Sequence, residues 1–247
     1  MVKQFLEVCN RWDLAHTDQK KGVPPPPLTD GVPRDQTTLD LPPVERVKVE
    51  SIDLTTAIRE RKSVRAYSDE PLTVDELAYL LWATQGVKSM GTIGVVRRTF
   101  RTVPSAASIH PFETYLLCNN VRGLARGIYR YEAMGHRLVP VDVENDLTDK
   151  IQAALYDQPA VKESCVTFFW VAVPDRMAWR YAEKAYPFVF IEAGHIAQNL
   201  SLAVQAIGAG CVVIGAIYDH LINAVLGFNP DERFVVYAAS VGKPART

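Results

Sequence analysis

The sequence predicts an α+β fold, in which helical and strand-like segments are interspersed without the regular spacing of a doubly wound sheet. The first observation is a pair of short strand-like runs, 127–131 and 137–141, on either side of a turn near Met134. The second is 165–173, a continuous apolar run that ends at Pro174 and is typical of a strand buried on both faces.

Cap residues mark the starts of the first two helices. Ser51 and Asp53 precede a short helix expected over 54–60. Thr73 begins the next helix with a capping box, since a glutamate follows three residues later, and Gly86 ends it.

The longest helical pattern covers 187–207 and is apolar nearly all round its middle, so we expect it at the centre of the molecule. Residues 87–103 are glycine-rich and basic, and we expect a loop there. The remaining expected elements are a leading helix within 1–16, strands at 112–118, 211–217 and 233–241, and helices at 146–156 and 219–226.

Composition bounds the class of protein. The chain has 247 residues, of which 48% are hydrophobic, enough to bury a sizeable core. A formal net charge of −1 gives no sign of a nucleic-acid-binding surface. No apolar run reaches the roughly 20 residues of a membrane helix, and the N-terminus lacks the pattern of a secretory signal. The four cysteines lie far apart and are typical of reduced thiols, so we expect a cytoplasmic protein without a metal centre.

The first 50 residues differ from the rest. Seven of the sixteen prolines fall within 20–43, a composition that favours polyproline II and lacks donors for a sheet. We therefore divide the chain into a proline-rich arm, 1–50, and a globular domain, 51–247. The arm could be a ligand for an SH3-type domain, but we expect it to wrap over the body or over a partner subunit.

A basic heptad, residues 61–67, follows the first helix. If its backbone is extended, Arg61, Ser63 and Arg65 point the same way, as two guanidinium groups beside a hydroxyl. Such groups match phosphate oxygens through charge-assisted hydrogen bonds. A phosphate-binding segment and a solvated basic strand explain the heptad equally well on these residues alone.

A second segment places small residues and hydroxyls before a strand. Pro104 and Pro111 bracket it, and Ser105 and Ser108 lie within it. Small side chains allow a planar ligand to approach the backbone, whose N–H groups can bond its heteroatoms. Taken alone, the segment is better explained as an ordinary loop rich in proline and serine.

Other candidate motifs do not indicate a site, because the residues around them do not match what each motif requires. Gly208 and Gly210 resemble the start of a dinucleotide fingerprint, but they follow a helix where that motif must follow a strand. The histidines lack metal-ligand spacing, and His195 is expected to be packed within the long helix. Nothing around Cys211 indicates an activated nucleophile.

Taken together, the motifs occur along the chain in an order that is known from one protein family. The runs R-K-S-V-R-A-Y, P-S-A-A-S-I-H-P-F-E-T-Y, G-I-Y-R-Y, I-E-A-G-H-I-A-Q-N-L-S-L-A and I-G-A-G-C-V-V-I-G-A resemble the nitroreductase-like FMN flavoprotein family. The most similar members are those of its SagB/thiazole-oxidase-type dehydrogenase branch. The resemblance extends over about 51–242 and is specific for fold and cofactor, but not for substrate.

The resemblance implies a nitroreductase-like fold, with a central, mainly antiparallel sheet flanked by helices in an intertwined homodimer. Each of two interface sites would bind one FMN. The expected activity passes a hydride or electrons from NAD(P)H or an organic donor to a small, planar acceptor. The alternatives are a flavin-binding module without turnover and an oxidase that acts on a modified ribosomal peptide.

The resemblance also assigns roles to residues. The phosphate and ribityl chain would be held by Arg61, Lys62, Ser63 and Arg65, with Lys243 or Arg246 as a C-terminal contact. The isoalloxazine would be lined by Pro104, Ser105, Ala106, Ala107 and Ser108 from the partner subunit, by Gln158 at its pyrimidine edge, and by backbone groups of Ile214 and Gly215.

One position departs from the branch. Its peptide-heterocycle oxidases carry a Lys-Tyr pair before the long helix, where this sequence has Arg180 and Tyr181. Arginine stays protonated and cannot act as a base, which argues against azole synthesis. Tyr181 remains a candidate proton donor, with a plain surface pair as the alternative.

Overall fold

The computed structural model of the chain describes residues 6–7, 9–10, 14–141 and 147–245. The expected leading helix lies largely outside these residues, and the candidate site residue Arg246 lies wholly outside them.

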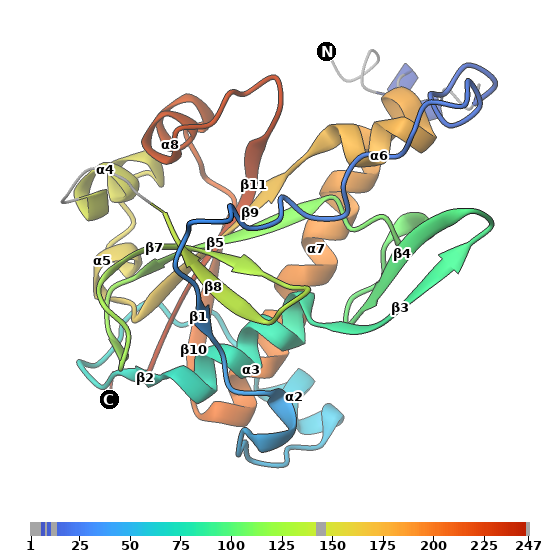
Figure 1. Cartoon of the computed structure of the whole chain (residues 1–247). Coiled ribbons are helices and arrows are strands. Elements are labelled where there is room, and N and C mark those ends of the chain that lie inside the picture. Colours follow the sequence, from blue (N-terminus) through green and yellow to red (C-terminus); the bar gives the residue numbers. More distant parts are fainter. Residues whose placement is uncertain (1–5, 8, 11–13, 142–146, 246–247) are drawn as a thin grey trace.

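A seven-stranded sheet forms the centre of the molecule (Figure 1). Every strand pair in it is antiparallel, in the order β1-β8-β7-β5-β9-β11-β10. The α+β prediction is therefore confirmed. The strands are β1 (Leu39–Asp40), β5 (Phe112–Cys118), β7 (Gly127–Glu132), β8 (Arg137–Pro140), β9 (Val166–Ala172), β10 (Gly210–Ile214) and β11 (Phe234–Gly242). A separate short parallel pair joins β2 (Leu72–Thr73) to β6 (Val121–Arg122).

Helices cover both faces of the sheet because strand side chains alternate between them. Leu116 and Phe168 point into a core shared with α3 (Val74–Gln85) and α7 (Ala185–Ala203). Their neighbours Leu117 and Phe169 point into a second core. That second core is shared with α4 (Leu147–Ala154), α5 (Ala160–Glu163) and α8 (Asp219–Leu226).

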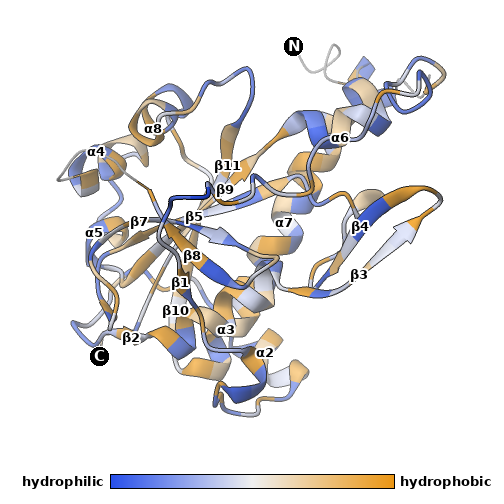
Figure 2. Ribbon diagram, in the orientation of Figure 1, coloured by the Kyte–Doolittle hydropathy of each residue, from blue (hydrophilic) through white to orange (hydrophobic). Residues whose placement is uncertain are grey.

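The long helix α7 crosses one face of the sheet and is hydrophobic over much of its surface (Figure 2). It continues as a 3-10 turn, Val204–Ile207, so the central helix expected over 187–207 is confirmed. The capping box at Thr73 is also present, with Glu76 as the third helical residue of α3.

The prediction of a loop at 87–103 is wrong. This segment forms an antiparallel hairpin of β3 (Val87–Ile93) and β4 (Val96–Arg101), which turns at Gly94 with φ +63°. Arginines in β4 hide its strand character, because their side chains are buried by partners from elsewhere in the chain. Arg101 donates to Gln85 Oε1 at 2.8 Å, and Arg98 lies 5.7 Å from the centroid of the Trp179 ring.

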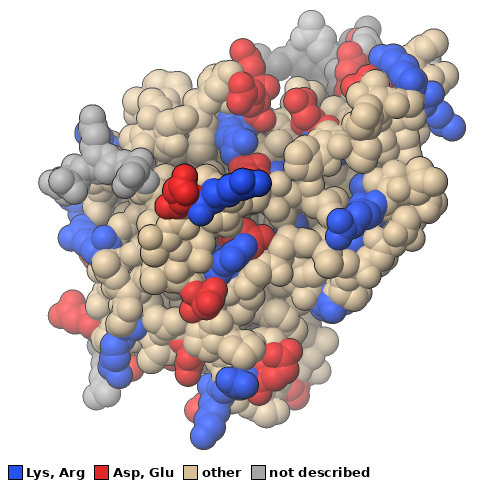
Figure 3. Space-filling model, viewed as in Figure 1, with Lys and Arg blue, Asp and Glu red and all other residues tan. Residues whose placement is uncertain are grey.

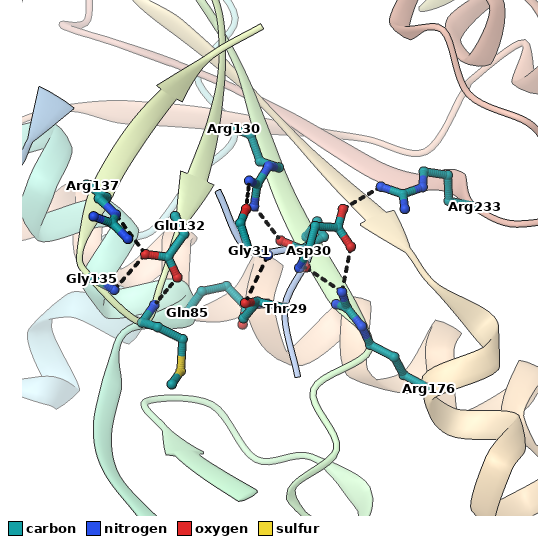
Figure 4. Close-up of polar contacts among 12 residues, drawn as sticks. Thr29, Asp30, Gly31, Gln85, Arg130, Glu132, Gly135, Arg137, Arg176 and Arg233 are labelled. Carbon is teal, nitrogen blue, oxygen red and sulfur yellow. Dashed lines mark hydrogen bonds and ion pairs between the residues drawn. The ribbon is translucent and has the colours of Figure 1, made fainter. Parts of the chain in front are cut away.

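The proline-rich arm packs along the body and contains β1, the edge strand beside β8 (Figure 1). Trp179, in α6 (Pro174–Tyr181), donates from Nε1 to the carbonyl of Val23 at 2.7 Å. Further along the arm, the carboxylate of Asp30 contacts Arg176 and Arg233, which belong to different elements (Figure 4).

Acidic and basic side chains are interspersed over the face shown in Figure 3, with no continuous basic stripe on it. Among the described residues, no helix combines the length and apolar character needed to cross a bilayer.

Candidate functional site

The basic heptad lies beside two segments that are remote in sequence. Val64 N–H donates to the carbonyl of Cys211 in β10 at 2.9 Å, and Ser68 N–H donates to the carbonyl of Lys243 at 2.9 Å. A strand over 63–67 does not form, since only single bridges at Ser63 and Tyr67 pair this segment with the body. The structure nevertheless joins the heptad to the end of the final strand.

The close approach depends on a glycine. A Cβ added to Gly210 would lie 2.5 Å from Val64 Cγ2, which is a severe clash. The hydroxyl of Tyr67 bonds to the carbonyl of Val64 in its own segment at 2.8 Å and to the carbonyl of Ser240 in β11 at 2.9 Å. Burial raises the pKa of this phenol far above its usual range, so it stays protonated and holds the heptad in place.

Three cations are neighbours in sequence of an exposed hydroxyl in this segment. Arg61, at the end of α2 (Leu54–Glu60), is half-buried, while Lys62, Ser63 and Arg65 are exposed. Within the described part of the chain, no carboxylate forms an ion pair with any of the three cations. The donor set therefore fits a phosphate, which needs unpaired cations and hydrogen-bond donors. We call residues 61–65 the basic segment.

Lys243 has a different role from the other cations. Its ammonium donates to Glu76 Oε1 and to the carbonyl of Ile207, both at 2.6 Å, and only 13% of its side chain is exposed. The backbone of Lys243 lies beside the basic segment, but its charge ties the end of β11 to α3 and to the end of the long helix.

The residues proposed for the ring wall form a strained turn, 104–108. Ala107 and Ser108 within it, and His110 just after it, have φ of +51°, +53° and +52°. Each such residue costs on the order of 1–2 kcal/mol when it is not glycine. The turn is held in part by His110 N–H, which donates to Ser105 Oγ at 2.8 Å.

Glu192 is a site residue that sequence reasoning missed. It lies in α7, 4% exposed, and its Oε1 accepts from Ala106 N–H at 2.7 Å. Burial raises the pKa of its carboxyl group to about 7, although hydrogen bonds from Ala106 and from the Ser105 side chain oppose the shift. The signal in the sequence was an acid in the apolar middle of the longest helix.

Tyr181 packs against the same small buried cluster as the turn. Its ring packs edge-on to Phe188 at 4.9 Å, and both belong to a small cluster that includes Ala106 and Ala107. The guanidinium of Arg180 lies 5.6 Å from the centroid of the Tyr181 ring. The structure therefore brings the candidate proton donor to the proposed ring wall.

The remaining candidates lie near the second core of the sheet, which contains Ile214. Gln158 follows a tight turn in which Tyr156 has φ +55°, and the Tyr156 ring stacks on Tyr218 at 4.0 Å. Tyr218 comes shortly after Ile214, the buried last residue of β10, and the exposed Gly215. Gln158 and the two backbone candidates are thus on neighbouring segments.

Two of these sets of candidates, the turn 104–108 and the basic segment, lie at different positions along the long helix. The turn 104–108 is bonded to Glu192, whereas the basic segment adjoins Lys243, which is bonded to Ile207. Eleven residues, or about 16 Å at 1.5 Å per residue, separate Glu192 from Ala203, the last residue of α7. One chain therefore presents the turn beside the middle of α7 and the basic segment near its C-terminal end.

The outward face of α7 is apolar and exposed. Tyr186, Phe190 and Ile191 are 47%, 53% and 55% exposed. His195, expected to be packed, is exposed on this face, because it follows Ile191 by one helical turn. Clustered exposed hydrophobic side chains on a central helix are typical of an interaction surface.

Comparison with known proteins identifies the class. The nitroreductase family model matches residues 58–243, and the chain belongs to the nitroreductase family. It is 31% identical to the nitroreductase-like protein MJ1384 of Methanocaldococcus jannaschii over 192 residues, which cover 78% of this chain and 90% of that protein. It is 23% identical to the trifolitoxin-processing protein TfxB of Rhizobium leguminosarum bv. trifolii, over 64% of this chain and 44% of that protein.

Solved structures share the fold. A nitroreductase-like protein from Ralstonia eutropha has a TM-score of 0.68 at 23% identity, covering 91% of this chain and 100% of that one. A chain of the Escherichia coli microcin synthetase McbBCD complex has a TM-score of 0.65 at 19% identity, covering 99% and 92%. A Desulfovibrio desulfuricans neighbour, solved in complex with FMN, has a TM-score of 0.55 at 19% identity, covering 79% and 88%. The nitroreductase-like fold is thus confirmed.

Proposed function

We propose that this protein is an FMN-dependent oxidoreductase that works as a homodimer. Membership of the nitroreductase family supports the class of reaction. The observation that carries the proposal is the unpaired cluster of Arg61, Lys62 and Arg65 around Ser63, fixed at the edge of the sheet. These residues would hold the FMN phosphate and ribityl chain.

The ring would lie between residues of two chains. Gln158 would lie near its pyrimidine edge, backbone groups of Ile214 and Gly215 would face it, and the turn 104–108 from the other chain would line it. Arg246 stays in the proposal as a further phosphate contact. Lys243 contributes through its backbone position, since its ammonium is bonded to Glu76.

The separation of the two groups supports the dimer. About 16 Å of helix lies between Glu192, which bonds the turn 104–108, and Ala203, the end of α7 near the basic segment, and this separation supports a site built from two chains. A second chain packed against Tyr186, Phe190 and Ile191 would cover the apolar face of α7 and bring its own turn to the basic segment.

When bound, FMN accepts a hydride and passes electrons on, which is the chemistry the protein lacks. Its own residues bind, orient and exclude water. Tyr181, beside the turn 104–108, is the candidate proton donor to the substrate. Cys211 takes no part as a nucleophile, because burial raises the pKa of its thiol. We propose that the protein takes electrons from NAD(P)H or an organic donor and passes them to a small planar acceptor. We propose the cytoplasm as its location.

A second candidate function is oxidation of a modified ribosomal peptide. The likeness to TfxB and to a chain of the microcin synthetase complex favours it. Arg180 in place of a lysine argues against it, because guanidinium does not deprotonate. Incubating the protein with an azoline-containing peptide separates the two, since azole formation would favour the peptide oxidase.

The test of the first candidate is spectroscopic. The purified protein, or the protein after addition of FMN, should absorb near 450 nm as flavoproteins generally do. Stopped-flow mixing with NADH or NADPH should bleach this band. A bound flavin that neither nucleotide nor any organic donor reduces would favour a binding module without turnover, and a protein that refuses FMN would refute the proposal.

A further inference from the structure

The turn 104–108 requires contacts that stabilise its strained backbone. Ala107 and Ser108, both with positive φ, would relax to ordinary backbone angles if nothing fixed the residues before them. The turn follows directly from the β3–β4 hairpin and precedes β5, so both of its ends are anchored in strands. Its middle is fixed by contacts from the long helix.

Two residues of α7 provide those contacts. Phe188 packs against the small buried cluster of Ile109, Met177 and Ala185, and Ala106 and Ala107 pack against the same cluster, so the helix and the turn share an apolar contact there. Glu192 follows one helical turn later on the same side and accepts from Ala106 N–H at 2.7 Å. The apolar contact fixes no direction of the backbone, whereas the hydrogen bond sets where the peptide plane of Ala106 points.

The carboxyl group of Glu192 is unusual in the apolar middle of a helix. It is 4% exposed, in the apolar middle of the helix, where an acid costs stability unless it is bonded. Its bonding partners are the Ala106 N–H and the Ser105 side chain, both in the turn. An apolar residue here would pack without that cost, so the acid serves the turn.

We propose that Glu192 is a positioning residue of the flavin site, which fixes the peptide of Ala106 so that the turn 104–108 fits against the cofactor ring. This inference rests on the proposed function, since it takes that turn to be the ring wall. It assigns Glu192 no contact with the flavin. Its role requires an acceptor atom at one place and does not require a charge.

Three substitutions separate position from charge. Glu192→Gln keeps the acceptor oxygen at full reach, and the FMN Kd should stay within about threefold of the wild type. Glu192→Leu has similar size but no acceptor, and Glu192→Asp keeps the charge while retracting the oxygen by one methylene. Both should weaken FMN binding on the order of tenfold or more, because no acceptor atom then reaches the Ala106 N–H.

Glu132 provides a matched control. It is 3% exposed and accepts from the N–H groups of Met134 and Gly135 at 3.0 and 2.8 Å, in the turn between β7 and β8 (Figure 4). Glu132→Leu should lower the melting temperature and leave the FMN Kd unchanged. If Glu192→Leu does not fold, the Gln and Asp variants alone decide the question.

The experiment has two readouts on the full-length dimer. The first is the FMN Kd from flavin fluorescence, and the second is amide hydrogen exchange of residues 104–110 without FMN. We expect faster exchange there in Glu192→Leu and Glu192→Asp, but not in Glu192→Gln or Glu132→Leu. Unchanged exchange in the Leu and Asp variants would overturn the positioning role. So would an unchanged Kd in these variants, or a Gln variant as weak as Leu.

The two proposals fail in distinguishable ways. A wild-type protein that binds no FMN would overturn the proposed function, and with it the role of Glu192 in the flavin site, even if exchange showed that Glu192 holds the turn. A wild-type protein that binds FMN with the same Kd as all three Glu192 variants would overturn this inference alone.

Discussion

Asp30, in the proline-rich arm, lies 2.7 Å from Arg176 Nη2 in helix α6, across 146 residues of sequence. The same carboxylate also contacts Arg233, just before β11, and the Asp30 N–H donates to Glu113 Oε1 at 3.0 Å (Figure 4). Arg176 is only 4% exposed and pairs with Glu113 as well, at 2.7 Å. One arm residue therefore fastens the N-terminal segment to two elements of the body.

Removing this fastening should loosen the arm. Asp30→Ala deprives a buried guanidinium of one partner while Glu113 remains, so we expect a loss of about 2–3 kcal/mol in the free energy of unfolding. Denaturant unfolding measures it, and hydrogen exchange should rise over 19–30. The control is Asp18→Ala, whose pair with Lys21 is exposed and contributes at most about 1 kcal/mol. Equal losses in the two variants would show that the Asp30 contacts do not anchor the arm.

The basic segment gives the sharpest mutational prediction. Arg61→Ala with Arg65→Ala removes two charged hydrogen-bond donors, each worth roughly 1.5–3 kcal/mol. FMN affinity should fall on the order of a hundredfold or more in a fluorescence titration. Arg59→Ala, an exposed arginine two residues earlier, should leave the affinity unchanged. Retention of flavin by the double variant would mean that the phosphate lies elsewhere.

Gly210 should tolerate no side chain. Its missing Cβ admits Val64, so Gly210→Ala would push the basic segment off the sheet edge or strain β10. We expect a stability loss of about 1–3 kcal/mol together with weaker FMN binding. Gly194→Ala, where an added Cβ meets nothing within 4 Å in one chain, should keep the fold intact. Thermal melts and flavin titrations of both variants check this, and a wild-type melt for Gly210→Ala would contradict it.

Glu192 makes stability depend on pH. Because its folded pKa, about 7, lies above the ordinary 4.5, the folded state binds the extra proton between these values. Stability from this group is therefore lost as pH rises from about 4.5 to about 7, and the total loss is about 3 kcal/mol. The difference between wild type and Glu192→Gln, measured by denaturant unfolding at several pH values, should change over this window. A flat difference would show that the carboxyl group titrates normally.

The dimer is tested on the exposed face of α7. Phe190→Asp places a charge in the proposed interface and should yield monomers in sedimentation, with loss of flavin because each site needs two chains. Leu39→Asp, an equally surface-located change on edge strand β1, should remain dimeric. A wild-type protein that is monomeric with bound flavin would contradict the interface.

Local signals account for what the sequence predicts well. The capping box at Thr73, the apolar run of β9 and the helical pattern of α7 depend on neighbouring residues, and the structure contains all three. The position of the basic segment beside Lys243 was implied only by resemblance, since it results from the sheet order.

Long-range partners account for what the sequence does not predict. The arginines of β4 read as loop residues because Gln85 and Trp179, which bury Arg101 and Arg98, lie far away in sequence. Asp30 is likewise unremarkable until the fold supplies its partners, whereas Glu192 stands out in the sequence only as an acid within an apolar helix. Neither periodicity nor propensity carries information about such contacts.

The most direct test of the central claim compares FMN with riboflavin, which lacks the phosphate. If residues 61–65 clasp that phosphate, FMN should bind on the order of a hundredfold more tightly, and the difference should shrink sharply in the Arg61→Ala, Arg65→Ala protein. Equal affinities of the wild-type protein for the two flavins would contradict the claim.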